Sequence, residues 1–263
     1  MKTVTLEFID SIAILTLNRP EVLNSMVDQL AIDAREALAE VRTMSNIRAL
    51  VLTGAGRAFC AGAELNDTLL NGSAEQPARA YLDDNMRLLT NPWIQDLHDF
   101  PIPVIAAVNG VAAGAGVGLA LAADITVAAQ SASFILNFSS KLGLIPDVGV
   151  TWHLSRRIGL ARATALALLG NKLTAEKAVE WGLIWECVAD DQLHHHAITL
   201  AQTLANAPRH AALELRQALH YAQSNTLPQQ LDYERQRQCV LVETAAFREG
   251  VNAFKEKRKP NFD

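Results

Sequence analysis

The sequence predicts a layered α/β fold with mostly parallel strands. Short apolar runs typical of strands alternate with longer segments of helical periodicity, which is the order found where helices connect parallel strands. Half of the 263 residues are hydrophobic and 19% are charged, as in a globular protein. A chain of this length can bury a substantial core, so we expect one main domain.

The first half of the chain is expected to begin with a strand pair that ends at the turn signal Asn18-Arg19-Pro20. Apolar residues then recur at helical spacing and would form one buried face. Residues 71–77 have loop composition and precede a second helix. The expected strands are 4–8, 12–17 and 49–52, and the expected helices are 27–41 and 81–97.

The second half begins with two more apolar strands, 104–108 and 125–128, which lie on either side of a helix of small residues. From residue 161 onward the pattern is mostly helical. These helices could form a lid or a subunit interface. They are expected at 161–169, 175–181, 192–206, 210–222 and 231–257.

Charge and cysteine content exclude several function classes. A formal charge of −5 argues against a nucleic-acid partner, which needs clustered cations. The one basic cluster, residues 255–259, is either a solvated helix end or a contact to a phosphorylated ligand. The three cysteines are scattered without the spacing of a metal site or a disulfide framework, so we expect no metal and a cytoplasmic location.

Residues 104–123 carry no charge over the length needed to span a bilayer. Asn109 and Gly110 interrupt this segment midway, and three further glycines follow. We therefore interpret it as a strand, a turn and a buried helix, and expect no membrane partner.

Two short segments of small residues, 61–65 and 114–118, each follow an expected strand. Small side chains let a ligand approach the backbone, and N–H groups at the start of a helix are unpaired and favour negative charge. Two such loops facing one another would form an oxyanion hole, which stabilises a developing negative charge on oxygen. Tight helix packing explains the same residues, and spacing alone does not separate the two interpretations.

Several ordered motifs resemble the enoyl-CoA hydratase/isomerase, or crotonase, superfamily from about residue 15 to the C-terminus. These motifs are Leu17-Asn18-Arg19-Pro20 with Leu23-Asn24, Thr53-Gly54 with Phe59-Cys60-Ala61-Gly62, Pro103 to Gly110, Asp124-Ile125, Gly143-Leu144-Ile145-Pro146, Trp181-Gly182-Leu183, and Ala253-Phe254 with Lys257-Arg258.

This resemblance implies a spiral of ββα units in residues 1–200 and a helical trimerisation region in 201–263. It implies an acyl-CoA substrate without a further cofactor, and a homotrimer or a pair of trimers. The backbone amides of Ala63 and Ala115 would hold the thioester oxygen. The residues expected to bind substrate or CoA are Asn24, Ala61, Ala63, Glu64, Leu65, Asn66, Ala115, Phe254 and Lys257.

Hydratases of this superfamily use two glutamates, which would fall at Gly118 and near Ser139 or Ser140, and neither position carries a carboxylate here. Asp147 is the candidate acid/base, because related isomerases, including those that convert a ring-epoxide CoA thioester to an oxepin in phenylacetate degradation, carry a catalytic Asp in this segment. A helix N-cap is the structural alternative for Asp147. The sequence therefore favours an acyl-CoA isomerase, with a hydratase or a catalytically silent acyl-CoA-binding subunit as alternatives.

Two residues depart from the pattern of this branch. Val150 stands where a second glycine is usual after the aspartate, and a bulkier residue there could reshape the acyl pocket. Glu64 replaces the usual Asp of the first loop and keeps its charge, so we expect it to have a structural role.

Overall fold

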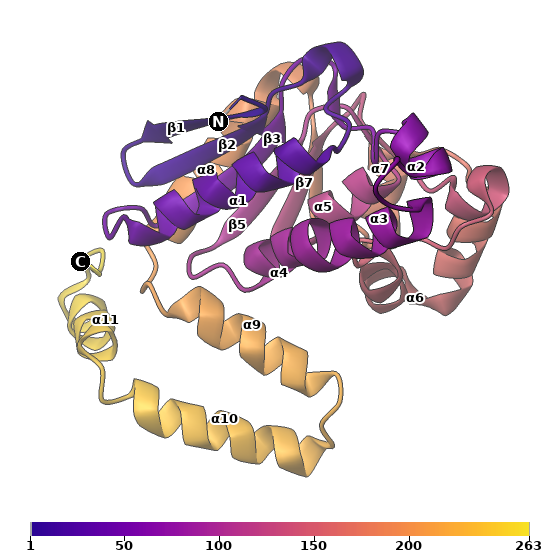
Figure 1. Ribbon diagram of the computed structural model, residues 1–263. Coiled ribbons are helices and arrows are strands. Elements are labelled where there is room, and N and C mark those ends of the chain that lie inside the picture. The colour runs from indigo at the N-terminus through magenta and orange to yellow at the C-terminus, as the bar shows by residue number, and fades with distance from the viewer. Residues whose placement is uncertain (1, 263) are drawn as a thin grey trace.

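The computed structural model describes residues 2–262 and contains two sheets linked by repeated strand–strand–helix units (Figure 1). The larger sheet has six strands in the order β1-β2-β3-β5-β7-β10, and the smaller has four in the order β4-β6-β8-β9. The large-sheet strands are β1 (Val4–Ile9), β2 (Ile12–Leu17), β3 (Ala49–Gly54), β5 (Val104–Val108), β7 (Ile125–Ala129) and β10 (Glu186–Val188). The small-sheet strands are β4 (Ala58–Cys60), β6 (Val111–Ala113), β8 (Ser133–Ile135) and β9 (Leu173–Thr174).

The repeat of the fold is one strand in each sheet followed by a helical segment. It occurs three times, as β3-β4, β5-β6 and β7-β8, and each pair is followed by helix before the chain returns to the large sheet or continues to β9. All neighbours from β2 to β10 in the large sheet are parallel, and β1 pairs antiparallel with β2. The predicted parallel α/β order is confirmed. Periodicity did not predict the strands of the second sheet, because each of them spans only two or three residues.

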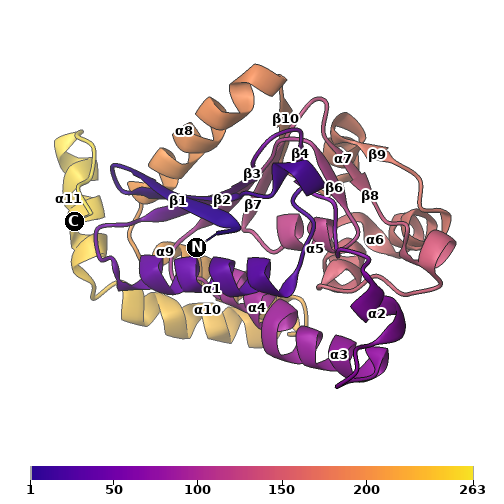
Figure 2. The same ribbon diagram turned by 45° about the horizontal axis from the view of Figure 1, so that its top comes forward.

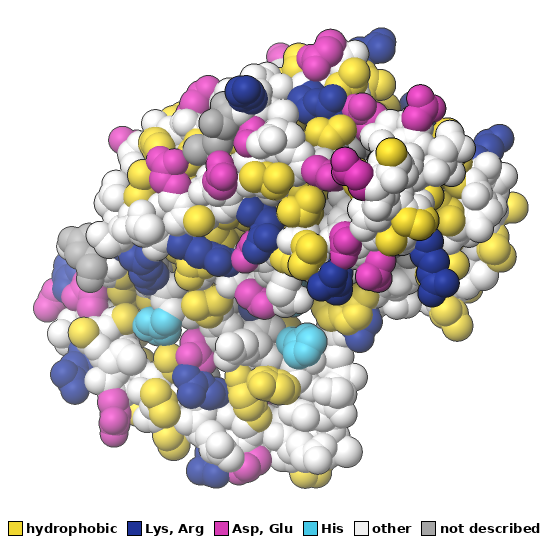
Figure 3. All heavy atoms as spheres, viewed as in Figure 1, with side chains coloured by type: hydrophobic (Ala, Val, Ile, Leu, Met, Phe, Trp, Pro, Cys, Tyr) yellow, Lys and Arg dark blue, Asp and Glu magenta, His cyan; other side chains and the backbone are white. Residues whose placement is uncertain are grey.

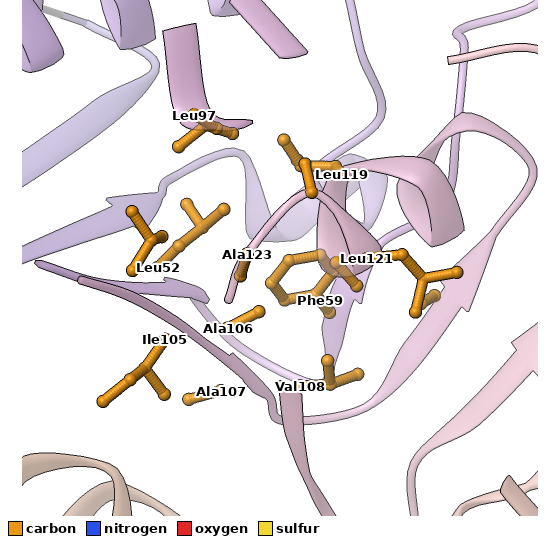
Figure 4. Packing of buried hydrophobic residues seen from close by; sticks show 14 of the residues in the cluster. Leu52, Phe59, Leu97, Ile105, Ala106, Ala107, Val108, Leu119, Leu121 and Ala123 are labelled. Atoms are coloured by element: carbon orange, nitrogen blue, oxygen red, sulfur yellow. The ribbon is translucent and has the colours of Figure 1, made fainter. Parts of the chain in front are cut away.

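Two helices cover opposite faces of the large sheet, as Figure 2 shows for α1 (Asp28–Thr43) and α8 (Leu193–Ala205). The apolar face predicted for residues 27–41 is confirmed, because Leu30, Ala34 and Leu38 are all buried. Between sheet and helices, side chains of β3 and β5 pack against Phe59, Leu119 and Leu121 (Figure 4). The chain passes from β3 through β4, and from β5 through β6, and the two small-residue loops begin directly after β4 and β6.

The predicted helix 81–97 is present as three joined pieces. These are α3 (Ala78–Asn85), a π-helical turn (Met86–Thr90) and α4 (Asn91–His98). A short helix, α2 (Asp67–Asn71), comes before the predicted loop. A second π-helical turn, Phe138–Leu142, precedes α6.

The C-terminal third is helical, as predicted, but two of its elements differ from the predicted ones. The helix expected at 161–169 is the second half of α6 (Val150–Leu169), whose backbone kinks at Gly159. The prediction of a single helix at 231–257 is wrong. Two helices, α10 and α11, occupy this region, because the Thr244 side chain caps the start of the second one. The remaining helices are α5 (Ala115–Leu121), α7 (Ala175–Trp181), α9 (Ala211–Ala222), α10 (Leu227–Leu241) and α11 (Ala245–Glu256).

Helices α9, α10 and α11 extend away from the sheets (Figure 1). The domain boundary predicted at residue 200 falls within α8, which packs on the large sheet, and α9 begins at Ala211. On the face shown in Figure 3, cationic and anionic side chains are interspersed. None of the helices formed by residues 2–262 is both long and apolar enough to cross a bilayer, and the uncharged segment 104–123 forms β5, β6 and α5.

Candidate active site

The first small-residue loop is held against the start of α1 by backbone hydrogen bonds. Met26 pairs with Ala63 as an isolated parallel bridge, in which the Met26 N–H donates to Gly62 at 2.7 Å and the Glu64 N–H donates to the Met26 carbonyl at 2.9 Å. These two bonds involve the carbonyl of Gly62 and the N–H of Glu64, the residues on either side of Ala63. The Ala63 N–H itself donates none of the backbone hydrogen bonds found outside the helices and strands of residues 2–262.

The second loop lies directly beside the first. Gly62 has a φ of +89°, and a β-carbon there would press on the Ala113 carbonyl and come within 3.3 Å of the Ala115 nitrogen. Glycine is therefore required at position 62 for both its backbone angle and the close approach. Ala115 is the first residue of α5, where a backbone N–H has no intrahelical acceptor.

Ala63 and Ala115 line one cavity together with Asp147, so the structure brings together the three predicted catalytic residues. A negative oxygen placed between the two loops would meet two backbone donors and the N-terminal end of α5. The full lining is Met26, Val27, Asp28, Ala63, Glu64, Asn66, Leu69, Tyr81, Leu82, Asn85, Met86, Thr90, Ala115, Asp147 and Val148.

The Asp147 carboxyl group does not have the surroundings of a helix cap. Its Oδ1 atom is buried and has no hydrogen-bond partner. Helix α6 begins at Val150 with Gly149 as N-cap, and no side chain bonds to its first turn, so the N-cap alternative for Asp147 is wrong. Burial raises the pKa of Asp147 to about 6, and a hydrogen bond from its own backbone N–H offsets this only in part.

An unusual backbone conformation holds this carboxyl group in the cavity. Val148 has a φ of +52° and is almost fully buried, although a β-branched side chain disfavours the left-handed region. Gly149 follows with a φ of +75°. Two consecutive left-handed residues turn the chain sharply between Asp147 and α6, which directs the carboxyl group into the cavity instead of toward the helix.

Two other carboxylates line the cavity, and both are engaged. Glu64 accepts hydrogen bonds from Arg19 at 2.9 Å and Ser25 at 3.0 Å, and the Arg19 side chain lowers its pKa. This is the structural role expected for Glu64. Asp28 accepts hydrogen bonds at Oδ1 from Tyr81 at 2.9 Å and Asn85 at 2.7 Å. Among the carboxylates of this cavity, only Asp147 combines a buried oxygen with the lack of a partner.

The predicted substrate contacts of the first loop fall into two groups. Asn24 is fully buried, accepts a hydrogen bond from the Arg19 N–H and donates to the carbonyls of Ala55 and Ala58, so its side chain supports the loop from behind. Contact of this side chain with CoA stays a prediction. Ala61 is half-buried, Leu65 is exposed, and Asn66 caps α2 through the N–H of Leu69.

Phe254 and Lys257 lie far from the cavity. Phe254 lies in the last turn of α11 and Lys257 follows its last residue, and Figures 1 and 2 place α11 across the molecule from α2 and α3. Phe254 is 85% exposed and lines a separate apolar depression with Phe247. The structure does not bring these two residues to the site within one chain.

Sequence reasoning did not identify the polar wall formed by Asp28, Tyr81, Asn85 and Thr90. Tyr81 and Asn85 are four residues apart on the predicted helix, which places them on one face and is the signal that could have linked them. Nothing in the sequence placed Asp28 opposite that face, because the contact joins α1 to α3 across more than fifty residues.

Comparisons with known proteins agree with this geometry. A family profile described as enoyl-CoA hydratase/isomerase matches residues 7–263. The 1,2-epoxyphenylacetyl-CoA isomerase of Escherichia coli strain K12 is 50% identical over 248 residues, covering 94% of this chain and 93% of that protein. A protein of Rhodobacter capsulatus described as a probable enoyl-CoA hydratase is 45% identical over 260 residues, covering 99% of this chain and 97% of its own.

The solved structure of enoyl-CoA hydratase from Bacillus anthracis superposes with a TM-score of 0.89 at 32% identity and full coverage of both chains. The expected crotonase-like spiral of ββα units is thus confirmed. The chain is an enzyme and belongs to the enoyl-CoA hydratase/isomerase family.

Proposed function

We propose that this protein is an acyl-CoA isomerase that uses Asp147 as its single acid/base. The observation that carries the proposal is the buried, unpartnered Oδ1 of Asp147 in the same cavity as Ala63 and Ala115. A buried carboxyl oxygen without a partner costs stability, so its presence at this place favours a catalytic use over a silent binding subunit.

The proposed reaction moves one proton within the acyl group. With a β,γ-unsaturated acyl-CoA, the Asp147 carboxylate removes a proton from the α-carbon, and the resulting charge is delocalised onto the thioester oxygen. The N–H groups of Ala63 and Ala115 stabilise that oxygen. Neutral Asp147 then returns the proton to the γ-carbon, so the double bond becomes conjugated with the thioester. The reaction as proposed uses no further cofactor.

Two features disfavour a hydratase that uses the family's two glutamates. A side chain at Gly118 would collide with the backbone of Val148, so the chain has no room for a carboxylate there. Ser139 and Ser140 do not line the cavity, and the Ser139 hydroxyl donates to the Leu144 carbonyl. The 1,2-epoxyphenylacetyl-CoA isomerase of Escherichia coli supports an isomerase, and its name suggests a ring-epoxide acyl group for this chain as well.

The test is turnover of a β,γ-unsaturated acyl-CoA by the parent protein and Asp147→Asn. General acid–base contributions are typically about 10² to 10⁴-fold, so the variant should lose at least about 10²-fold in turnover while acyl-CoA binding is retained. Asp83→Asn, which changes an exposed carboxylate of α3 outside the cavity, is the matched control and should keep parent activity. Isomerisation by Asp147→Asn at the parent rate would disprove the proposal, and faster hydration of crotonyl-CoA than isomerisation would favour a hydratase.

We infer further that the protein assembles as a trimer or a pair of trimers through its C-terminal helices. The support is the exposed apolar side chains of Phe247 and Phe254 on α11, with the family resemblance. A contact of Phe254 or Lys257 with CoA would then have to come from a second chain. Sedimentation velocity at micromolar concentration should show the oligomer and a smaller species for Phe254→Asp, whereas a monomeric parent protein would contradict assembly.

A further inference from the structure

A chain of hydrogen bonds runs along the cavity wall formed by Asp28, Tyr81, Asn85 and Thr90. The Thr90 hydroxyl donates to Oδ1 of Asn85 at 2.8 Å, and Nδ2 of Asn85 donates to Oδ1 of Asp28 at 2.7 Å. The Tyr81 hydroxyl donates to the same Asp28 oxygen at 2.9 Å. Two polar side chains, those of Tyr81 and Asn85, therefore converge on one carboxylate, and Thr90 extends the chain through Asn85, within an otherwise largely apolar wall.

These bonds fix the orientation of the Asn85 amide. Oδ1 of Asp28 accepts from the Asn85 nitrogen, and the Asn85 oxygen is then left for the Thr90 hydroxyl. An amide nitrogen carries two N–H groups, and within residues 2–262 the Asn85 nitrogen donates one side-chain hydrogen bond, to Asp28. The hydrogen bonds of residues 2–262 assign no acceptor to the second N–H, and Asn85 belongs to the cavity lining.

The π-helical turn Met86–Thr90 explains how this wall is built. Thr90 follows Asn85 by five residues, which is about 1.4 turns of an α-helix and would direct the two side chains to different sides. A π-helix closes its backbone hydrogen bonds five residues apart, so residues with this spacing come into line. Such turns are rare and occur frequently at functional sites. Here the turn has a specific effect, because it brings the Thr90 hydroxyl onto the Asn85 amide.

We propose that the free N–H of Asn85 recognises an uncharged oxygen acceptor, such as a ring ether or epoxide oxygen, on the acyl group of the substrate. This inference rests on the proposed function, because it identifies the cavity occupant as the acyl part of a CoA thioester. Asn85 lines the same cavity as Ala63, Ala115 and Asp147, so a group that reaches it extends beyond the thioester. The acceptor is uncharged because the Asp28 carboxylate lies 2.7 Å from the same nitrogen and would repel an anion.

Unreactive substrate analogues test the proposal by binding alone. Cyclohexylacetyl-CoA and the ring-position isomers of tetrahydropyranylacetyl-CoA have nearly the same shape and differ in one ether oxygen. Both dissociation constants are measured by calorimetry for the parent and for Asn85→Ala. In the variant, the best ether isomer should lose roughly fivefold in affinity relative to the cyclohexyl analogue, as expected for the loss of one hydrogen bond. Affinity for the cyclohexyl analogue should change little.

Two further variants separate recognition from a general disturbance of the wall. Thr90→Val keeps the side-chain shape and removes the bond that holds the Asn85 amide, so it should reduce the ether preference in part. Asn91→Ala makes the same change as Asn85→Ala at the next asparagine of the helix, which does not line the cavity, and should leave the ratio unchanged. A ratio that stays within about twofold of the parent in both Asn85→Ala and Thr90→Val would overturn the proposal.

The experiment also separates this inference from the proposed function. Asp147→Asn should lose isomerase turnover and keep the ether preference, because it does not change Asn85. A parent protein that shows the preference without isomerase activity would contradict the proposed function alone. Isomerase activity without any dependence of binding on Asn85 would contradict this inference alone, and failure of every analogue to bind would contradict both.

Discussion

The carbonyl oxygen of Val148 occupies the space that a β-carbon on Gly118 would need. Gly118 lies on α5, and Val148 adjoins Asp147, so this contact sets how closely the segment carrying the carboxyl group approaches the helix whose first residue is Ala115. Glycine at this position, where the family resemblance predicts the first glutamate of a hydratase, thus leaves room for the Val148 carbonyl. It allows Asp147 to take its place in the cavity.

Gly118→Ala should therefore lower isomerase turnover by up to about 10²-fold, because a displacement of a catalytic group by about 1 Å can cost that much. The added methyl group meets backbone rather than a flexible side chain, so the segment must move. Steady-state kinetics on purified protein would measure the effect. Gly250→Ala is the matched control, since a β-carbon on this helical glycine of α11 meets nothing closer than 4.0 Å. Equal losses in both variants would contradict a local effect on Asp147.

The pH dependence of isomerisation should follow the ionisation of Asp147. Its carboxylate form accepts the proton, and burial raises its pKa to about 6, so kcat/KM should rise as the pH increases through about 6 and then level off. An unshifted Asp would be half ionised near pH 4 and nearly complete this rise by about pH 5. A profile measured from pH 4.5 to 8 that is already flat at its lowest pH would contradict a buried base.

The difference in stability between Asp147→Asn and the parent protein should depend on pH. The pKa of Asp147 in the folded protein lies above the unfolded value of 3.8, so the folded state binds the proton more tightly. In the parent protein, this contribution to the free energy of unfolding is present at low pH and is lost as the pH rises through about 6. The free energy of unfolding of the variant minus that of the parent should therefore increase by about 2 kcal/mol from pH 4 to pH 7. A shift of about two pKa units corresponds to roughly 3 kcal/mol in total, and part of that change falls below pH 4. Urea unfolding of both proteins at these pH values measures this, and a pH-independent difference would contradict it.

Asn24→Ala should destabilise the protein by about 2 kcal/mol or more. It removes the hydrogen bonds that Asn24 donates to the half-buried carbonyl of Ala55 and the buried carbonyl of Ala58, which keeps only a longer bond from Asn109 at 3.3 Å, and it removes an Asn from a left-handed position, φ +55°. Asn18→Ala is the control, because Asn18 is exposed in the same motif. Thermal unfolding of both variants compares them, and a Tm for Asn24→Ala equal to that of Asn18→Ala would show that these bonds contribute little.

The sequence alone determined the alternation of strands and helices, the two small-residue loops and the identity of the three candidate catalytic residues. Apolar periodicity predicted α1, because this helix buries one continuous face. It also predicted strands of the large sheet, because these strands are continuous runs of buried apolar residues. It did not predict the small sheet, whose strands are too short for a pattern, or the break at Thr244, where one capping side chain divides a helical stretch.

Only the tertiary structure decided what the carboxylates of the cavity can do. Spacing could not distinguish a helix cap from an acid/base at Asp147, because that choice depends on the left-handed turn at Val148 and on burial by distant segments. It also could not show that Asp28 is occupied by Tyr81 and Asn85, or that a π-helical turn aligns Thr90 with Asn85. Protonation and hydrogen-bonding capacity depend on neighbours in space, and those neighbours exist only once the chain has folded.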